Sequence, residues 1–106
     1  MYAKYIKERE GKEIIEDEYG YATFAMFPDH CYVEDVFVLP EFRKSGYASG
    51  YIDKVCEIMK TRNIRKIFVS VDPRANGSTE SMKIILAYGF KLHASETNMI
   101  YFLITI

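Results

Sequence analysis

The sequence has no strong net charge and no apolar run long enough to span a membrane. Its 14 Lys and Arg side chains nearly balance its 15 Asp and Glu side chains, for a formal charge of −1. No overall field therefore draws the chain to nucleic acid or to an anionic membrane. The longest apolar run, residues 99–106, is interrupted by Thr105 and falls far short of the roughly 20 residues that a spanning helix needs. Any anion that binds this protein must meet a local site.

Cysteine is also scarce. Cys31 and Cys56 are the only two, and they lack the spacing of metal ligands. The first residues, MYAKYIKERE, contain no apolar signal region. We therefore expect a cytoplasmic protein without a metal site.

With 106 residues, 49% of them hydrophobic, the chain is long enough for one compact domain and too short for two, so we expect a single domain over residues 1–106.

The most informative stretch is residues 31–63, which predicts a strand, a polar turn and an amphipathic helix. Val and aromatic residues dominate 32–39, with Glu34 and Asp35 inside the apolar run. Pro40 ends the strand because proline has no ladder donor. Beyond the turn, apolar side chains recur at the spacing of a helix, at Ala48, Ile52, Val55 and Met59.

The turn between that strand and that helix has the features of an anion site. A helix that begins near Gly46 leaves its first backbone donors unpaired and its positive dipole end exposed. Gly46 lets a phosphate approach the backbone, Ala48 keeps the approach open, and Arg43 and Lys44 add positive charge. A basic turn with one glycine before a helix is equally typical of an ordinary loop and cap, so the turn alone leaves both interpretations open.

The remaining segments predict a mixed sheet. Alternating or β-branched runs predict strands at 1–6, 20–27, 66–71, 90–95 and 98–105, and a hairpin continued by Ile14 and Ile15. The short connection makes 20–27 antiparallel to 32–39, whereas a helical crossover makes 66–71 parallel to 32–39.

Three loop regions carry further predictions. Ser78 is expected to cap a second helix over 78–88. The run Glu16-Asp17-Glu18 is expected to be a solvated loop, because consecutive carboxylates on a turn rarely converge on a metal. His30 is expected to be an exposed turn residue.

The central segment resembles motif A of the GCN5-related N-acetyltransferases, the GNAT family. The motif Arg43-x-x-Gly46-x-Ala48 follows Val38-Leu39-Pro40-Glu41-Phe42, and the predicted order of elements resembles the family's from about residue 20 to the end of the chain. The resemblance implies an α+β fold of three layers. Its sheet is mixed and mostly antiparallel, with one splayed parallel strand pair and two main helices.

The resemblance also implies a short form of the family. Family members usually begin with a strand and two helices that form one wall of the acceptor site, and few residues precede 20–27 in this sequence. Either the acceptor is a large molecule bound on an open surface, or a second subunit of a homodimer supplies the wall.

In the family the cosubstrate is acetyl-CoA, and the resemblance assigns residues to it. Pantetheine and the thioester carbonyl would meet Phe37, Val38 and Leu39. Pyrophosphate would be held by Arg43, Lys44, Ser45, Gly46, Tyr47 and Ala48. Ser49 would add a hydroxyl at the helix start or serve only as a first-turn residue.

Acetyl transfer to an amine also needs a base. A lysine-like amine has a pKa of about 10.4, so its deprotonation near pH 7 costs about 4.6 kcal/mol. The resemblance assigns the general base to Glu34, with Asp35 as the second candidate. Because alternate residues of a strand point to opposite faces, we expect only one of them to line the cleft. Alternatively, both carboxylates simply pair with a nearby Lys or Arg.

The general acid departs from the family pattern. Family members often place a tyrosine four residues before a Gly-Phe pair, and alignment on Gly89 and Phe90 puts Ile85 there. Ile85 cannot donate a proton. Tyr88, about one turn further along the helix, is the catalytic candidate, although it also fits the boundary of an amphipathic helix. A thiol leaving group with a pKa of about 8.5 does not strictly need an acid, so slower turnover is expected.

These features predict an N-acetyltransferase that moves acetyl from acetyl-CoA to an amine by direct attack. A protein lysine or N-terminus is favoured over a small amine, because a short front end would leave the cleft open. Two alternatives stay open: a non-catalytic acetyl-CoA-binding module that regulates a partner, and an α+β interaction domain without a cofactor.

Overall fold

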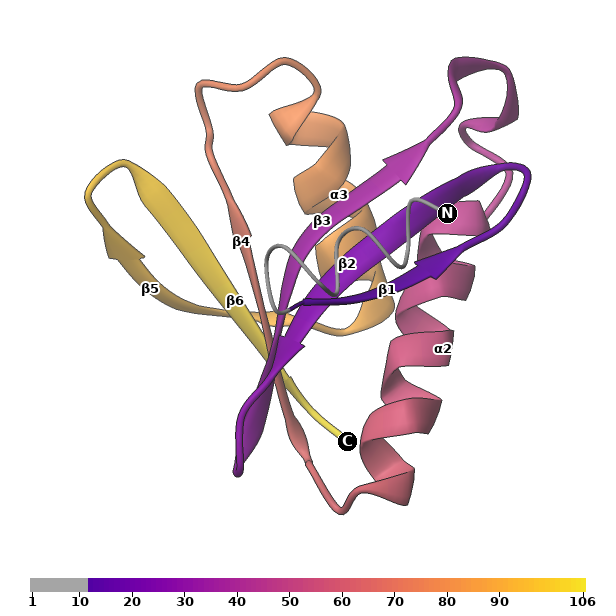
Figure 1. The fold of residues 1–106 in the computed structure, drawn as a ribbon. Coiled ribbons are helices and arrows are strands. Elements are labelled where there is room, and N and C mark those ends of the chain that lie inside the picture. The colour runs from indigo at the N-terminus through magenta and orange to yellow at the C-terminus, as the bar shows by residue number, and fades with distance from the viewer. Residues whose placement is uncertain (1–11) are drawn as a thin grey trace.

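The computed structural model describes residues 12–106, which form a six-stranded sheet and two long helices (Figure 1). The predicted strand at 1–6 lies outside the described residues. The elements in chain order are β1 (Glu13–Glu16), β2 (Gly20–Met26), β3 (His30–Val38), a short 3-10 helix (Pro40–Phe42), α2 (Tyr47–Thr61), β4 (Lys66–Val71), α3 (Ser78–Tyr88), β5 (Lys91–Glu96) and β6 (Met99–Thr105). Neither helix of this part of the chain is long and apolar enough to cross a membrane.

The sheet has the order β1-β2-β3-β4-β6-β5. Strands β3 and β4 pair in parallel, and the other neighbouring pairs are antiparallel. This arrangement confirms the predicted α+β fold with a mostly antiparallel mixed sheet, one parallel pair within residues 12–106 and two main helices.

Both helices pack against the same face of the sheet. Every second side chain of β4 is buried. These side chains, Ile67, Val69 and Val71, share one core cluster with Val55 of α2 and Ile85 of α3. The two helices also touch each other through contacts described below. The described residues therefore supply two layers, sheet and helices, of the three that we expected.

A β-bulge interrupts the pairing of β2 with β3. Thr23 lies opposite Asp35 and Phe24 lies opposite Val33, so Glu34 has no partner on β2. Val33 belongs to the core and Val36 packs against it, although they are three residues apart. Because the bulge adds one residue, Glu34 and Asp35 both emerge on the face away from the helices. The expectation that strand alternation would send them to opposite faces is therefore wrong.

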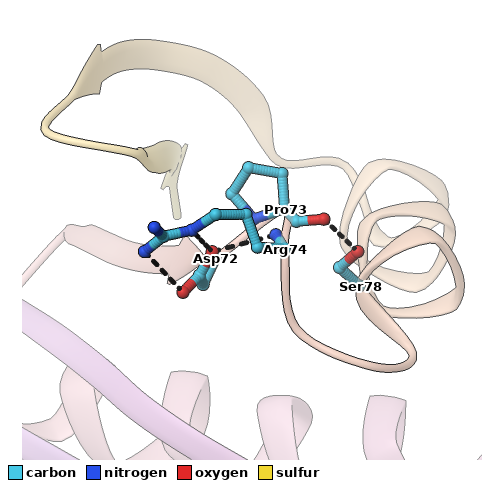
Figure 2. A network of polar contacts seen from close by, with 4 residues as sticks. All are labelled: Asp72, Pro73, Arg74 and Ser78. Atoms are coloured by element: carbon cyan, nitrogen blue, oxygen red, sulfur yellow. Dashed lines mark hydrogen bonds and ion pairs between the residues drawn. The ribbon is translucent and has the colours of Figure 1, made fainter.

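The loop from β4 to α3 is closed by side-chain bonds (Figure 2). Asp72 accepts hydrogen bonds from the backbone N–H of Arg74 at 2.9 Å and from its guanidinium at 3.2 and 3.3 Å. The Ser78 hydroxyl donates to the carbonyl of Pro73 at 3.0 Å. The predicted capping role of Ser78 is wrong, because the N-cap is Gly77 with φ 80° and Ser78 instead ties the helix back to the end of β4.

The contact between Gly20 and β3 predicts a large effect on stability. A Cβ at Gly20 would lie 2.0 Å from the Phe37 carbonyl oxygen, so Gly20→Ala must push β2 away from β3. We expect a loss of about 2 kcal/mol or more in the free energy of unfolding. At Gly50, in α2, a Cβ would meet nothing within 4 Å, so Gly50→Ala should gain about 1 kcal/mol. Urea denaturation of both variants checks this, and equal midpoints would contradict it.

Candidate functional site

The parallel strands β3 and β4 separate toward their carboxyl ends, as Figure 1 shows. Among residues 12–106, their pairing runs from His30 and Lys66 to Val33 and Val69 and stops there. β3 then continues to Val38 beside β2 alone, and β4 continues to Val71 beside β6 alone. The backbone edge of 34–38 that faces β4 is thus left without a strand partner. An extended ligand with amide groups can hydrogen-bond to such an edge.

The turn after β3 presents backbone amides at the start of α2. Lys44 has φ 65° and Gly46 has φ 84°, and Gly46 is the N-cap. The first helical bond of α2 is donated by Gly50 to the Gly46 carbonyl at 3.0 Å, so the amides of residues 47–49 have no helical acceptor. No described side chain caps this end. Such a concave run of free N–H groups at a positive helix end binds anions.

Space is available at the same place. A Cβ at Gly46 would meet nothing within 4 Å, so an oxyanion can approach the backbone there. Lys44 and Ser45 are exposed beside it. The turn therefore fits a phosphate group in both charge and access.

Arg43 is held at the end of β3. Its Nε donates to the Val38 carbonyl at 2.9 Å, and its guanidinium carbon lies 5.6 Å from the centroid of the Phe37 ring. These contacts place a positive charge at the carboxyl end of β3. Leu39 is tied down as well, because its N–H donates to the Tyr19 carbonyl at 2.8 Å.

The residues predicted to bind phosphate fall into two groups, according to whether their side chains are free to contact a ligand. Arg43, Lys44, Ser45 and Gly46 offer side-chain charge, a hydroxyl or open backbone. Tyr47 and Ala48 can offer only their backbone N–H groups, because their side chains are used in packing. The Tyr47 ring stacks on Tyr19 at 4.4 Å, and Ala48 packs against a cluster of Ala22, Val38 and Tyr51.

A hydrogen bond that the sequence did not predict fixes the start of α2. The hydroxyl of Tyr51, which is 2% exposed, donates to Asp17 Oδ1 at 2.6 Å. Asp17 also accepts from the N–H groups of Tyr19 and Gly20, so it is a structural anchor as well as the exposed loop residue that we expected, whereas Glu16 belongs to strand β1. The bond from Tyr51 is the main cause of the lowered pKa of Asp17.

Both candidate bases are exposed on the sheet face away from the helices. Glu34 forms an ion pair with Lys12, which is the pairing that we weighed as its alternative role. Asp35 accepts a hydrogen bond from the Tyr21 hydroxyl at 3.4 Å. The bulge therefore places two carboxylates next to the point where β3 and β4 separate.

The candidate acid Tyr88 lies elsewhere, between the two helices. Its hydroxyl donates to Asp53 Oδ1 at 2.5 Å and lies 3.6 Å from Cys56 Sγ. Burial and the bond to Asp53 raise the pKa of Tyr88. It is at the carboxyl end of α3, roughly 15 Å along the helix from the end that follows β4. Ile85, at the position of the family tyrosine, is buried in the core.

The fold and this site define an α+β domain with an uncapped helix start beside a split parallel strand pair. A family model described as the acetyltransferase (GNAT) family matches residues 6–83. That is more than half of the chain, so the chain belongs to the GNAT acetyltransferases. Among curated proteins, no sequence matches.

Solved structures share this fold at low sequence identity. A GNAT-family acetyltransferase from Elizabethkingia anophelis, solved with acetyl-CoA bound, has a TM-score of 0.75 at 15% identity and covers 97% of this chain and 82% of its own. The PaiA N-acetyltransferase from Thermoplasma acidophilum, in complex with coenzyme A, has a TM-score of 0.79 at 12% identity, with 95% and 66% covered. The anti-CRISPR protein AcrVA5 has a TM-score of 0.71 at 16% identity, with 85% and 96% covered.

The bond between Tyr51 and Asp17 predicts a pH-dependent stability. A carboxyl group whose pKa is lowered by folding stabilises the protein above its unfolded pKa, about 3.9, and this contribution is lost as pH falls through the folded pKa. We expect Tyr51→Phe to cost about 1 to 2 kcal/mol near neutral pH and much less in strong acid. Urea unfolding at both pH values tests this. Tyr101→Phe is the control, since the Tyr101 hydroxyl has no partner among residues 12–106. A cost for Tyr51→Phe that is independent of pH would contradict the hydrogen bond between Tyr51 and the Asp17 carboxylate.

Proposed function

We propose that the protein is an N-acetyltransferase that uses acetyl-CoA and acetylates an amine by direct attack, with a protein lysine or N-terminus favoured over a small amine. The observation that carries the proposal is the run of free amides at the start of α2, set beside the unpaired edge of β3. In addition, AcrVA5 is covered over 96% of its own chain, so a short form of the fold is represented among solved structures.

The residues of the turn fit the cosubstrate. Its pyrophosphate would be held by the amides of residues 46–49 and by Arg43, Lys44 and Ser45, and its pantetheine arm would lie along Phe37 and Val38. Ser49 would add its hydroxyl at the helix start. When bound, acetyl-CoA supplies an activated acyl group. The N–H of Leu39 already donates a hydrogen bond to the Tyr19 carbonyl, so we assign to Leu39 only packing contacts with the cosubstrate.

Glu34 would prepare the acceptor amine. The ammonium form has no lone pair to attack with, so a base must take one proton, and the carboxylate of Glu34 can accept it. The ion pair with Lys12 marks the place where an acceptor ammonium would displace the Lys12 ammonium. Asp35, one residue along on the same face, is the second candidate.

Proton delivery to the leaving group is not needed for a thiolate near neutral pH, and Tyr88 is its candidate donor. Tyr88 can serve as the acid only if its hydroxyl leaves Asp53. With Ile85 at the family position, we expect slower turnover than in members that carry the tyrosine. This observation favours the alternative function, a non-catalytic acetyl-CoA-binding module that regulates a partner.

The amides at the helix start predict that a negative charge there abolishes cofactor binding. We expect Gly46→Glu to weaken acetyl-CoA binding about 100-fold or more, because the carboxylate occupies the anion site. Gly77→Glu is the matched control, since Gly77 is also a helix N-cap, with φ 80° against 84° at Gly46, and is equally free of contacts. Calorimetric titration measures both. No binding by folded wild-type protein would exclude the enzyme and the binding module alike.

The position of Glu34 predicts a loss of turnover without a loss of affinity. We expect Glu34→Gln to lower kcat by about 10²- to 10⁴-fold while acetyl-CoA affinity stays unchanged. Asp35→Asn should have a smaller effect, and Glu57→Gln, on the exposed side of α2, should have none. Acetylation of a panel of proteins and amines, followed by mass spectrometry, provides the readout. A wild-type protein that binds acetyl-CoA but acetylates nothing would favour the regulatory module.

A further inference from the structure

A hollow of about 330 Å³ lies on the sheet face away from the helices, over β3, β4, β6 and β5. Its lining includes His30, Tyr32, Phe68, His93, Glu96 and Tyr101. His30 is thus half-buried against neighbouring rings, and the expectation of an exposed turn residue is wrong. None of these residues belongs to the proposed cofactor site.

The strand register explains why rings gather there. Tyr32 lies beside Phe68 across the parallel pair, and Tyr101 lies opposite Ser70 on the next strand. A second bulge, between Leu92 and Ala94 of β5, leaves His93 without a partner on β6. Since a bulge puts two successive side chains on one face, His93 joins the others.

The rings of His30 and His93 both contact the ring of Phe68. The His30 ring stands edge-on to Phe68 with centroids 5.5 Å apart, and the His93 ring stands near edge-on at 5.2 Å. The hydroxyl of Tyr32 is hydrogen-bonded to Ser70, which holds that ring in place. The hollow therefore offers fixed aromatic surfaces from several sides.

One side chain with a formal charge lines the hollow, and that charge is negative. Glu96 is the only carboxylate among the described residues that line it, and neither Lys nor Arg is among them. Lys66 lies in register with His30, and the pKa of the neighbouring Asp29 is lowered mainly by its bond to His30 and to a smaller extent by Lys66. Aromatic faces with one carboxylate attract an organic cation such as an alkylammonium group and disfavour an anion.

The hollow is close to the proposed base. Tyr32 precedes Glu34 by two residues on β3, which is about 7 Å along a strand, and both side chains lie on the same face. Alternate side chains of an extended peptide have the same spacing. A lysine in the hollow would therefore place the lysine two residues away in its own chain beside Glu34.

We infer that the hollow binds the side chain of a second lysine in the acceptor polypeptide, two residues from the lysine that is acetylated. The assignment of the acceptor rests on the proposed function, whereas cation binding by the hollow does not. The aromatic rings of the hollow and Glu96 together favour a Lys-x-Lys segment. Its reactive amine then lies beside the carboxylates of the bulge, Glu34 and Asp35.

The test uses three blocked peptides: Ala-Lys-Ala-Lys-Ala, the same peptide with its second lysine replaced by norleucine, and the same peptide with its first lysine replaced by norleucine. We expect kcat/KM to be about tenfold higher for the peptide with two lysines. Glu96→Gln and Phe68→Leu should each reduce this preference to about twofold or less and leave the norleucine peptides unaffected. The control Glu57→Gln removes one carboxylate from α2 and should preserve the preference.

A second readout separates this inference from the proposed function. Without acetyl-CoA, the imidazole NMR signals of His30 and His93 should shift on titration with the two-lysine peptide and shift less with the norleucine peptides, and Glu96→Gln should abolish the difference. If no peptide is acetylated but these shifts occur, the hollow is still a cation site and the enzymatic proposal fails. If the peptides are acetylated equally well and shift the imidazole signals equally, the inference is overturned. Glu96 is exposed, so its variant is expected to fold.

Discussion

The end of the pairing between β3 and β4, immediately before the bulge at Glu34, is the constraint on which the rest of the structure depends. A parallel pair that continued to Val38 would satisfy its own backbone groups and leave no edge for an extended ligand. Because β3 gains one residue and bends away, its last residues keep a free edge, and Glu34 and Asp35 emerge together on one face. Among residues 12–106, the same local irregularity thus leaves a free backbone edge and brings two carboxylates to one face.

An anion site is useful only if its donors are held in place, and two sets of contacts do this for the start of α2. Buried Tyr51 is bonded to Asp17 in the β1–β2 turn, and Tyr47 is stacked on Tyr19. Arg43 is bonded to the end of β3. The positive end of the helix is therefore fixed relative to the end of β3.

The two faces of the sheet serve different purposes. Helices α2 and α3 cover one face and build the core, whereas the other face carries Glu34, Asp35 and the aromatic hollow within the described part of the chain. Three solved structures share the fold at identities of 12% to 16%.

The sequence by itself determined the family, the order of the elements and the turn from Arg43 to Ala48, because apolar periodicity, proline and glycine act locally. It predicted the end of α3 at Tyr88 but not the true N-cap, Gly77, because the local rules rank serine above glycine at that position. Tertiary structure alone decided which face each carboxylate occupies, that Asp17 anchors Tyr51, that Tyr88 is held by Asp53 and that rings from four strands meet. These features depend on bulges and on partners distant in sequence, and strand alternation predicts neither.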